Sequence, residues 1–490
     1  MQEAKQLQAH LTVMGLLQND FYLRKIITTF AISNPSTLNY ARLIFDRIQN
    51  PSTYIYNTMI RAYASTPNPI PAIHLYNCMQ RRGAPPDNYT FPFLLKACSA
   101  LRAPQKGEEV HCSVIKNGLD ADLFVQNSLI HLYGSNADVN AAHQVYDGML
   151  KRDVATWTTM VSCCAGFAPI ELAWRLFNEM PERSIVSFSA MIAGFVGRGK
   201  FKEALHLFHD LQIARMEPND STLMSVLCAC SSLGALDCGR WIHSYIHKTR
   251  GDELDTRITT ALIDMYCKCG SLENALSVFR GSKEKFVGEW TAMITGLAMH
   301  GFGERSIELF EEMVGLEIKP NVVTFVAVLS ACTHSGLVKD GLRYFECMKS
   351  KYGIEPTIEH LGCVVDLLGR AGLISEAVEF IRKMPIEANG AIWGALLNAS
   401  RIHKNIEVGE LAARWLIREE PGNGAVYMAL LSLYGDVGRL DDVERIKREM
   451  KDAGSRKSPG CSMIEVDGNC REFVGGDRSH LALDAVTGLV

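Results

Sequence analysis

Histidine and cysteine are the residues of this chain that could hold a catalytic zinc ion. The sequence has 490 residues, among them 14 His and 15 Cys. A zinc-dependent nucleobase deaminase uses His-x-Glu for one ligand and the proton-transferring carboxylate, and Cys-x-x-Cys for two further ligands. Here no His is followed by Glu two positions later, and no two Cys have two residues between them. The chain is therefore predicted to have no enzymatic activity and no cofactor.

Closer pairs of cysteines do not replace the missing motif. Cys228 and Cys230, like Cys267 and Cys269, are separated by one residue and lie in segments of helical periodicity. We interpret them as residues on helix faces, without a metal. A long chain with scattered cysteines also differs from a small disulfide scaffold, which favours small buried side chains in a reducing compartment.

A phosphate-binding loop and a histidine metal site were also considered. GFVGRGK at 194–200 resembles a phosphate-binding loop, but Phe201 stands where Ser or Thr would bind magnesium and no strand precedes it. We interpret this segment as a turn between helices. His111, His243 and His334 occupy comparable places in three distant segments. That separation favours packing or surface roles over a shared metal.

The elements that must position any functional residue are short helices, as residues 287–321 illustrate. Trp290, Met293, Ile294 and Leu297 recur at helical spacing and predict one apolar stripe. The glycine-containing turn GFG follows at 301–303.

A second helix follows this turn within the same unit. Ile307, Phe310 and Val314 predict its buried stripe, and Pro320-Asn321 closes the unit. Two such helices cannot bury their apolar faces alone, so copies of the unit must lie on either side.

Copies of this unit occur throughout the sequence. The segments YNTMIRAYA, WTTMVSCCA, FSAMIAGFV and WTAMITGLA begin at Tyr56, Trp157, Phe188 and Trp290. Self-similarity at intervals of about 30 to 36 residues predicts an all-α solenoid of helix-turn-helix repeats. Ten consecutive units of 31 to 36 residues can be framed as 53–87, 88–122, 123–153, 154–184, 185–219, 220–255, 256–286, 287–321, 322–357 and 358–389.

Composition agrees with a globular repeat protein. Hydrophobic residues make up 47% and charged residues 21%, with a net charge of -4. No apolar run is long enough to cross a membrane. The small net charge does not advertise a nucleic-acid partner, although a local basic groove is compatible with it.

Three segments carry a resemblance to a known family. FPFLLKACSAL at 91–101, LIDMYCKCGSLENALSVF at 262–279 and VVDLLGRAGLISEA at 364–377 resemble the L and S repeats of plant pentatricopeptide-repeat proteins of the PLS subclass. The resemblance implies a right-handed superhelical α-solenoid. Tetratricopeptide repeats are the nearest alternative, but their uniform 34-residue period is absent.

The resemblance also divides the rest of the chain. Residues 1–52 resemble partial L-type and S-type repeats, and 53–389 the ten repeats. Residues 390–423 and 424–458 resemble the E1 and E2 helix pairs. The tail at 459–490 reads as two short strands around Asp467-Gly468, and it ends before any deaminase domain of the type called DYW.

In the family, the fifth and last residues of a repeat read one RNA base. Carried over to this sequence, the pairs Asn57 with Asp87 and Asn127 with Asp153 imply uridine, with cytidine second. Ser189 with Asn219 and Thr291 with Asn321 imply adenosine. Thr158 with Ser184 and Thr260 with Phe286 depart from readable pairs.

The remaining units are expected to be silent, because their fifth residues are Pro92, Met224, Val326 and Gly362. The expected RNA is U-n-U-n-A-n-n-A-n-n, read 5′ to 3′ from the N-terminal unit. The alternative interpretation is that Asn and Asp at unit ends are only helix caps and turn residues.

Three functions remain open from the sequence. The first is site recognition for C-to-U editing of organellar RNA, with a DYW-type deaminase acting in trans and multiple-organellar editing factors as partners. The second is RNA binding for splicing, processing or transcript stability. The third is a protein-binding scaffold without RNA. The E-type tail favours editing.

The resemblance implies a mitochondrion or a chloroplast, with the mitochondrion slightly favoured. MQEAKQLQAHLTVMGLL at 1–17 lacks the composition of a transit peptide and the apolar core of a secretory signal. Import would therefore require residues upstream of Met1.

Overall fold

The computed structural model describes residues 19–32, 37–251, 255–455, 461–466 and 469–474. Contacts divide the chain into two compact units, 1–222 and 223–490. The second helix expected near the N-terminus, the turn at 467–468 and the tail beyond 474 lie outside the described residues.

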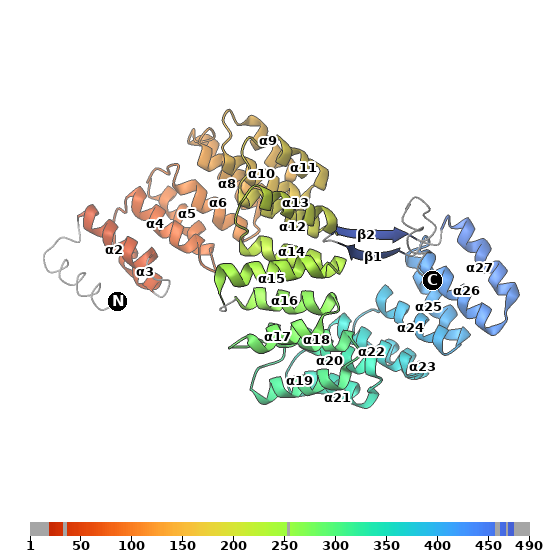
Figure 1. Cartoon of the computed structure of the whole chain (residues 1–490). Helices are drawn as coiled ribbons and strands as arrows, with labels where there is room; N and C mark the ends of the chain where they lie inside the picture. The colour runs from red at the N-terminus through yellow and green to blue at the C-terminus, as the bar shows by residue number, and fades with distance from the viewer. Residues whose placement is uncertain (1–18, 33–36, 252–254, 456–460, 467–468, 475–490) are drawn as a thin grey trace. The chain divides into compact units, whose positions relative to one another are not determined.

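The first unit consists of helix pairs (Figure 1). Its helices are α2 Asp20–Ile32, α3 Leu38–Asp46, α4 Thr53–Ala64, α5 Ile70–Arg81, α6 Thr90–Ala100, α7 Pro104–Lys116, α8 Leu123–Ser135, α9 Val139–Gly148, α10 Val154–Phe167, α11 Ile170–Glu179, α12 Ile185–Val196 and α13 Phe201–Ile213, and α14 Asp220–Leu233 spans the division.

The second unit continues the pattern and adds one strand pair. Its helices are α15 Leu236–Arg250, α16 Thr256–Lys268, α17 Leu272–Gly281, α18 Val287–Met299, α19 Gly303–Gly315, α20 Val322–Ser335, α21 Val338–Ser350, α22 Ile358–Arg370, α23 Ile374–Lys383, α24 Gly390–Ile402, α25 Ile406–Glu419, α26 Gly424–Val437 and α27 Leu440–Asp452. Strands β1 Cys461–Val466 and β2 Asn469–Val474 pair antiparallel, with Cys461 opposite Val474.

Within each unit the first helix of a pair packs on the first helix of the next pair. This series is α4, α6, α8, α10 and α12 in the first unit, and α16, α18, α20, α22, α24 and α26 in the second. Figure 1 shows α16 to α22 side by side in this way. The all-α helix-pair solenoid predicted from the repeats is confirmed, and the short strand pair read from the tail is present as β1 and β2.

Aromatic contacts couple neighbouring pairs. The fourth residue of a first helix meets, edge to face, an aromatic ring from the second helix of the preceding pair. Ring centroids are 5.0 Å apart for Phe279 and Trp290 and 5.1 Å apart for Phe177 and Phe188. Because such a ring is buried only when the preceding pair is present, each pair depends on its neighbour for its core. Further contacts of this kind join Phe45 to Tyr56, Tyr76 to Phe91, Tyr146 to Trp157 and Phe310 to Phe325.

The predicted stripe of α18 is correct, but that of α19 is wrong. Trp290, Met293, Ile294 and Leu297 are all buried. Ile307 and Val314 are only half-buried.

Small residues lie on the buried face of α19 instead. Ser306 is fully buried and donates a 2.8 Å hydrogen bond to the carbonyl oxygen of Ile294. A Cβ on Gly303 would collide with α20. The helix approaches its neighbours through Gly303 and Ser306 because larger side chains would hold the backbones apart.

The cysteines are buried helix residues with one correction. Burial raises the pKa of the Cys98 thiol to about 11 and that of Cys332 to about 12, so both stay protonated at neutral pH. Cys363 is half-buried, and burial raises its pKa as well. Cys228, expected inside, is exposed, because the buried face of α14 passes through Leu227 instead.

Two of the three histidines occupy equivalent places. His111 lies in α7 and His243 in α15, both second helices, and their Nδ1 atoms lie 2.8 Å and 2.9 Å from the hydroxyls of Tyr133 and Tyr266. His334 lies in α20, a first helix, so its predicted equivalence is wrong. Among the described residues no group of three His, Cys, Asp or Glu could hold a metal.

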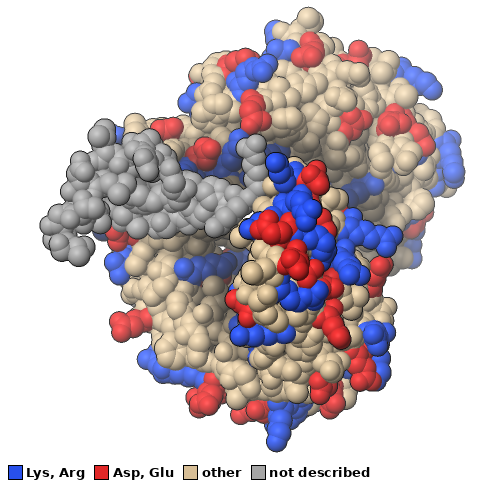
Figure 2. Space-filling view, turned by 90° about the vertical axis from the view of Figure 1, so that its right-hand side faces the viewer, with Lys and Arg blue, Asp and Glu red and all other residues tan. Residues whose placement is uncertain are grey.

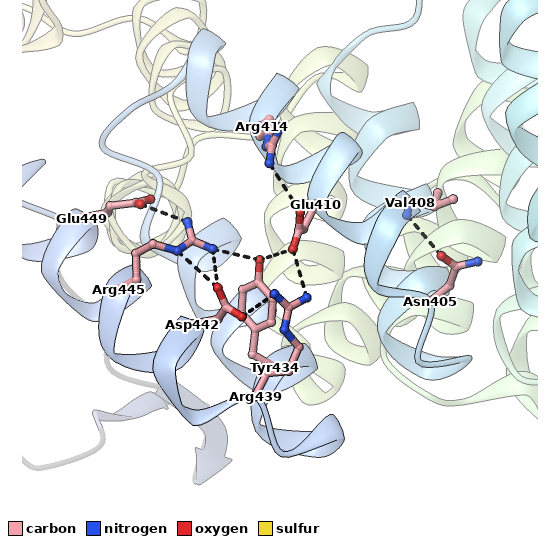
Figure 3. A network of polar contacts seen from close by, with 9 residues as sticks. All are labelled: Asn405, Val408, Glu410, Arg414, Tyr434, Arg439, Asp442, Arg445 and Glu449. Atoms are coloured by element: carbon pink, nitrogen blue, oxygen red, sulfur yellow. Dashed lines mark hydrogen bonds and ion pairs between the residues drawn. The ribbon is translucent and has the colours of Figure 1, made fainter.

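The C-terminal helices carry a connected polar network (Figure 3). Tyr434 is buried, and its hydroxyl donates to Glu410 at 2.6 Å and accepts from Arg445 at 3.3 Å. Burial raises the pKa of Tyr434 to about 12, so the hydroxyl keeps its proton. Asp442 bridges Arg439 and Arg445 at 2.6 Å and 2.8 Å. The network thereby joins α25, α26 and α27.

Helix α27 is polar over nearly its whole surface. Ile446 is its one buried residue. On the face seen in Figure 2, Lys and Arg side chains are intermixed with Asp and Glu. Such an outer face suits the last helix of a stack, because water and not another repeat lies against it.

Tyr434→Phe is expected to lower the free energy of unfolding by about 1.5–3 kcal/mol, since hydrogen bonds to two charged groups are lost. Urea unfolding followed by circular dichroism measures this. Tyr427→Phe is the matched control, because that hydroxyl donates only to the neutral carbonyl of Pro421 at 3.2 Å. An equal loss in both variants would contradict the role of the network.

Candidate nucleic-acid interface

The fold brings the fifth and last residues of several units together. The fifth residue lies in the second turn of a first helix, and the last residue precedes the next first helix, which packs beside it. Four of the predicted pairs lie within hydrogen-bond distance: Asn57 Nδ2 to Asp87 Oδ1 at 2.8 Å, Asn127 Nδ2 to Asp153 Oδ1 at 3.4 Å, Thr158 Oγ1 to Ser184 Oγ at 3.2 Å, and Ser189 Oγ to Asn219 Oδ1 at 3.3 Å.

Two predicted pairs are arranged differently. Thr291 and Asn321 both contact Thr324, at 2.8 Å and 3.0 Å, instead of each other. Thr260 donates to the carbonyl oxygen of Thr256 at 2.8 Å, and Phe286 offers no polar side chain to it.

The unit-ending residues do cap the following helix, but with one atom only. Asp87 Oδ1 accepts the backbone N–H groups of Tyr89 and Thr90, each at 3.0 Å. Asn321 Oδ1 accepts the backbone N–H of Thr324 at 3.0 Å. In the part of the chain that the structure describes, Asp87 Oδ2 and Asn321 Nδ2 have no partner. Capping and base reading are therefore compatible, because they use different atoms of one side chain.

Asp153 and Asn127 show the electrostatics of one pair. Burial raises the pKa of Asp153, but hydrogen bonds from the backbone and side chain of Thr156 and from Asn127 outweigh it and lower the pKa overall. The carboxylate is therefore ionised at neutral pH and can only accept. Asn127 Oδ1 is buried and has no partner among the described residues. This amide oxygen is available to a donor from a ligand.

Exposed apolar side chains form a second feature, which sequence reasoning missed. They occupy the second place of a unit, three residues before the fifth and on the same helix face. Five units share it, with exposed fractions of 46% for Tyr54, 66% for Tyr89, 72% for Phe124, 53% for Val186 and 60% for Val323. Their signal in the sequence is an apolar residue outside the apolar stripe. Aromatic faces beside hydrogen-bonding groups suit an unstacked base.

Comparison with known families and proteins follows the same boundaries. A model described as "PPR repeat" matches residues 127–154, 155–185, 186–214, 258–285, 290–318 and 360–387. "PPR repeat family" matches 51–100, "Pentatricopeptide repeat domain" 308–368 and "E motif" 403–465. Pentatricopeptide repeat-containing protein At5g66520 of Arabidopsis thaliana is 45% identical over 99% of this chain and 78% of its own length. The chain belongs to the pentatricopeptide-repeat family.

Two other proteins place this pentatricopeptide-repeat chain further. Pentatricopeptide repeat-containing protein At1g59720, chloroplastic/mitochondrial, of Arabidopsis thaliana is 39% identical over 91% of this chain and 67% of its own length. The crystal structure of PPR10 from maize, at 16% identity, superposes with a TM-score of 0.52 over 93% of this chain and 72% of that chain. The second likeness concerns the fold alone.

The rejected chemistry of the sequence has plain structural explanations. Residues 194–200 contain the end of α12 and the turn before α13, which is a connection between two helices of one repeat. Cys228 and Cys230 lie on different sides of α14, one exposed and one buried. Among the described residues, no helix is both long and apolar enough to cross a membrane.

Proposed function

We propose that this pentatricopeptide-repeat protein, of the PLS subclass, binds single-stranded RNA and reads one base with each readable repeat. The observation that carries the proposal is the repeated pairing of a fifth with a last residue whose second polar atom is uncommitted. Exposed rings such as Tyr89 and Phe124 lie beside these pairs and supply stacking surfaces.

The pair Asn57 and Asp87 suits uridine. Asp87 Oδ2 can accept the N3–H of uracil, and the second N–H of Asn57 Nδ2 can donate to a uracil oxygen. Cytosine fits less well but still fits, because its N4 amino group donates and its N3 accepts. Over residues 53–389 the proposed RNA is U-n-U-n-A-n-n-A-n-n.

Cations accompany the reading residues in the N-terminal repeats. Arg61 and Lys96 are exposed and lie four residues after the fifth residues Asn57 and Pro92, on the same helix faces. Positive side chains there can neutralise phosphates, so binding should weaken as salt concentration rises.

The E motif at 403–465 supports a role in C-to-U editing of organellar RNA. In this proposal the repeats select the site, and a DYW-type deaminase and multiple-organellar editing factors join as separate chains. The name of the relative At1g59720 supports a chloroplast or a mitochondrion. The protein itself would supply recognition and no catalysis.

The test is sequencing of organellar RNA from plants with and without this gene. Under the proposal a few cytidines lose conversion, and U-n-U-n-A-n-n-A lies upstream of them. Changed intron removal or transcript ends without changed cytidines would replace editing by RNA processing. Unchanged organellar RNA would favour a protein scaffold.

A further inference from the structure

Three threonines hydrogen-bond across a repeat boundary to a residue proposed to read a base. Thr90, Thr222 and Thr324 are each the third residue of a unit, and each side chain is fully buried. Thr90 Oγ1 lies 2.7 Å from Asn57 Oδ1, Thr222 Oγ1 lies 2.6 Å from Ser189 Oγ, and Thr324 Oγ1 lies 2.8 Å from Thr291 Oγ1.

Equivalent hydroxyls in two other units do not make this contact. Thr156 is also fully buried and donates to its N-cap Asp153 at 2.8 Å. Ser187 is buried and donates to the backbone oxygen of Ser184 at 2.8 Å. In the described residues neither of them bonds to the fifth residue of the preceding unit. Helix capping alone therefore does not explain the three threonines.

Counting protons around Thr324 fixes the direction of its bonds. Thr324 Oγ1 lies 3.0 Å from Asn321 Oδ1, which has no hydrogen and can only accept. The single proton of Thr324 is committed there. Thr291 must then donate its own proton to Thr324, which leaves lone pairs on Thr291 Oγ1 for a ligand.

The same count applies to Ser189. Thr222 Oγ1 donates to Asn219 Oδ1 at 2.9 Å, and the backbone N–H of Thr222 also donates to that oxygen at 2.9 Å. Ser189 can then donate only to Thr222, to Asn219 Oδ1 or to the carbonyl oxygen of Ile185, at 2.6 Å in the last case. Each choice consumes its proton.

The resulting pattern complements adenine. Ser189 Oγ offers an acceptor to the adenine N6 amino group, and Asn219 Nδ2 offers donors to adenine N1. In the described residues Asn219 Nδ2 has no other partner. At the uridine position, Thr90 holds Asn57 Oδ1, so that Asn57 Nδ2 points to Asp87 and donates.

We propose that Thr90, Thr222 and Thr324 are positioning residues that fix the donor and acceptor directions of the reading side chains in the preceding repeat. The inference rests on the proposed RNA binding and deepens it. It adds a third residue, from the next repeat, to the specificity of these three units.

The test measures dissociation constants of the full chain for RNA oligonucleotides that carry A, G, C or U at the position of the Ser189 repeat, at one salt concentration. Thr222→Val removes the hydroxyl and keeps the size. We expect the preference for A over the other bases to fall about 5-fold to 10-fold, as for one lost orienting hydrogen bond. Thr222→Ser should keep the preference within about twofold, because it retains a hydroxyl.

Thr156→Val is the matched control, since it removes a buried capping hydroxyl that makes no contact with Asn127. It should leave the base preference at the Asn127 repeat unchanged. If Thr222→Val does not fold, Thr90→Val is measured at the Asn57 repeat, with the same expected fall in its preference for U. An unchanged preference, or an equal loss for all four bases, overturns the inference. Wild-type protein that binds no RNA overturns the proposed function and the inference together.

Discussion

Alanine in place of both Tyr89 and Phe124 is expected to weaken RNA binding about thirtyfold or more. Stacking of a base on an aromatic side chain contributes about 1–3 kcal/mol, so two lost rings cost about 2–6 kcal/mol. The rings come from consecutive units and are 66% and 72% exposed. Because little of either ring is buried, the free energy of unfolding should barely change.

Fluorescence anisotropy with a labelled U-n-U-n-A-n-n-A oligonucleotide measures this loss. Phe302→Ala is the control, because Phe302 is 51% exposed but lies in the turn before α19, away from the second place of any unit. If the control variant loses as much affinity as the double variant, exposed rings matter only in a general way and the proposed surface is wrong.

The sequence predicted the solenoid because its signal is local and repeated. Apolar spacing in one helix and the interval between copies predict where helices begin. The unit starts at 287 and 322 coincide with the starts of α18 and α20, whereas α6 starts at Thr90, two residues after its unit. Asp87 explains this shift, because it caps the backbone N–H groups of Tyr89 and Thr90.

The face of α19 was not predictable from apolar spacing. A hydrophobic pattern weighs Ile307 and Val314 above Ser306, but close helix packing buries whichever residue lets two backbones approach. Ser306 satisfies its own hydroxyl on Ile294 and so can be buried without cost.

The interface was predictable only in part, for a similar reason. The fifth and last residues follow from the family resemblance and the unit frame. The threonine contacts do not, because Thr222 and Ser189 are 33 residues apart and a buried Thr near a helix start looks like an ordinary cap. The exposed rings of Tyr89 and Phe124 look like core residues when only their type is known.

Changing both Asn219 and Asn321 to Asp is expected to switch the preferred base from adenosine to guanosine at two positions. Each substitution replaces the Nδ2 donors by an acceptor, while Ser189 and Thr291 stay acceptors. Adenine N1 then faces a carboxylate and is disfavoured. Guanine presents the adjacent donors N1–H and N2–H, which match two acceptors. A mismatched base costs about 1–3 kcal/mol, so the two positions together change the preference by about 2–6 kcal/mol.

Stability should not confuse this result, because aspartate caps a helix as well as asparagine does and already ends the units at Asp87 and Asp153. Competition between oligonucleotides with A or G at both positions measures the switch. Asn389→Asp is the matched control: Asn389 caps α24 through Ile392 at 3.1 Å, but Gly362 is the fifth residue of its unit and offers no side chain. A double variant that still prefers adenosine would mean that these caps only cap. A switch confined to the double variant would mean that one side chain ends one helix with its oxygen and selects a base with its other atom.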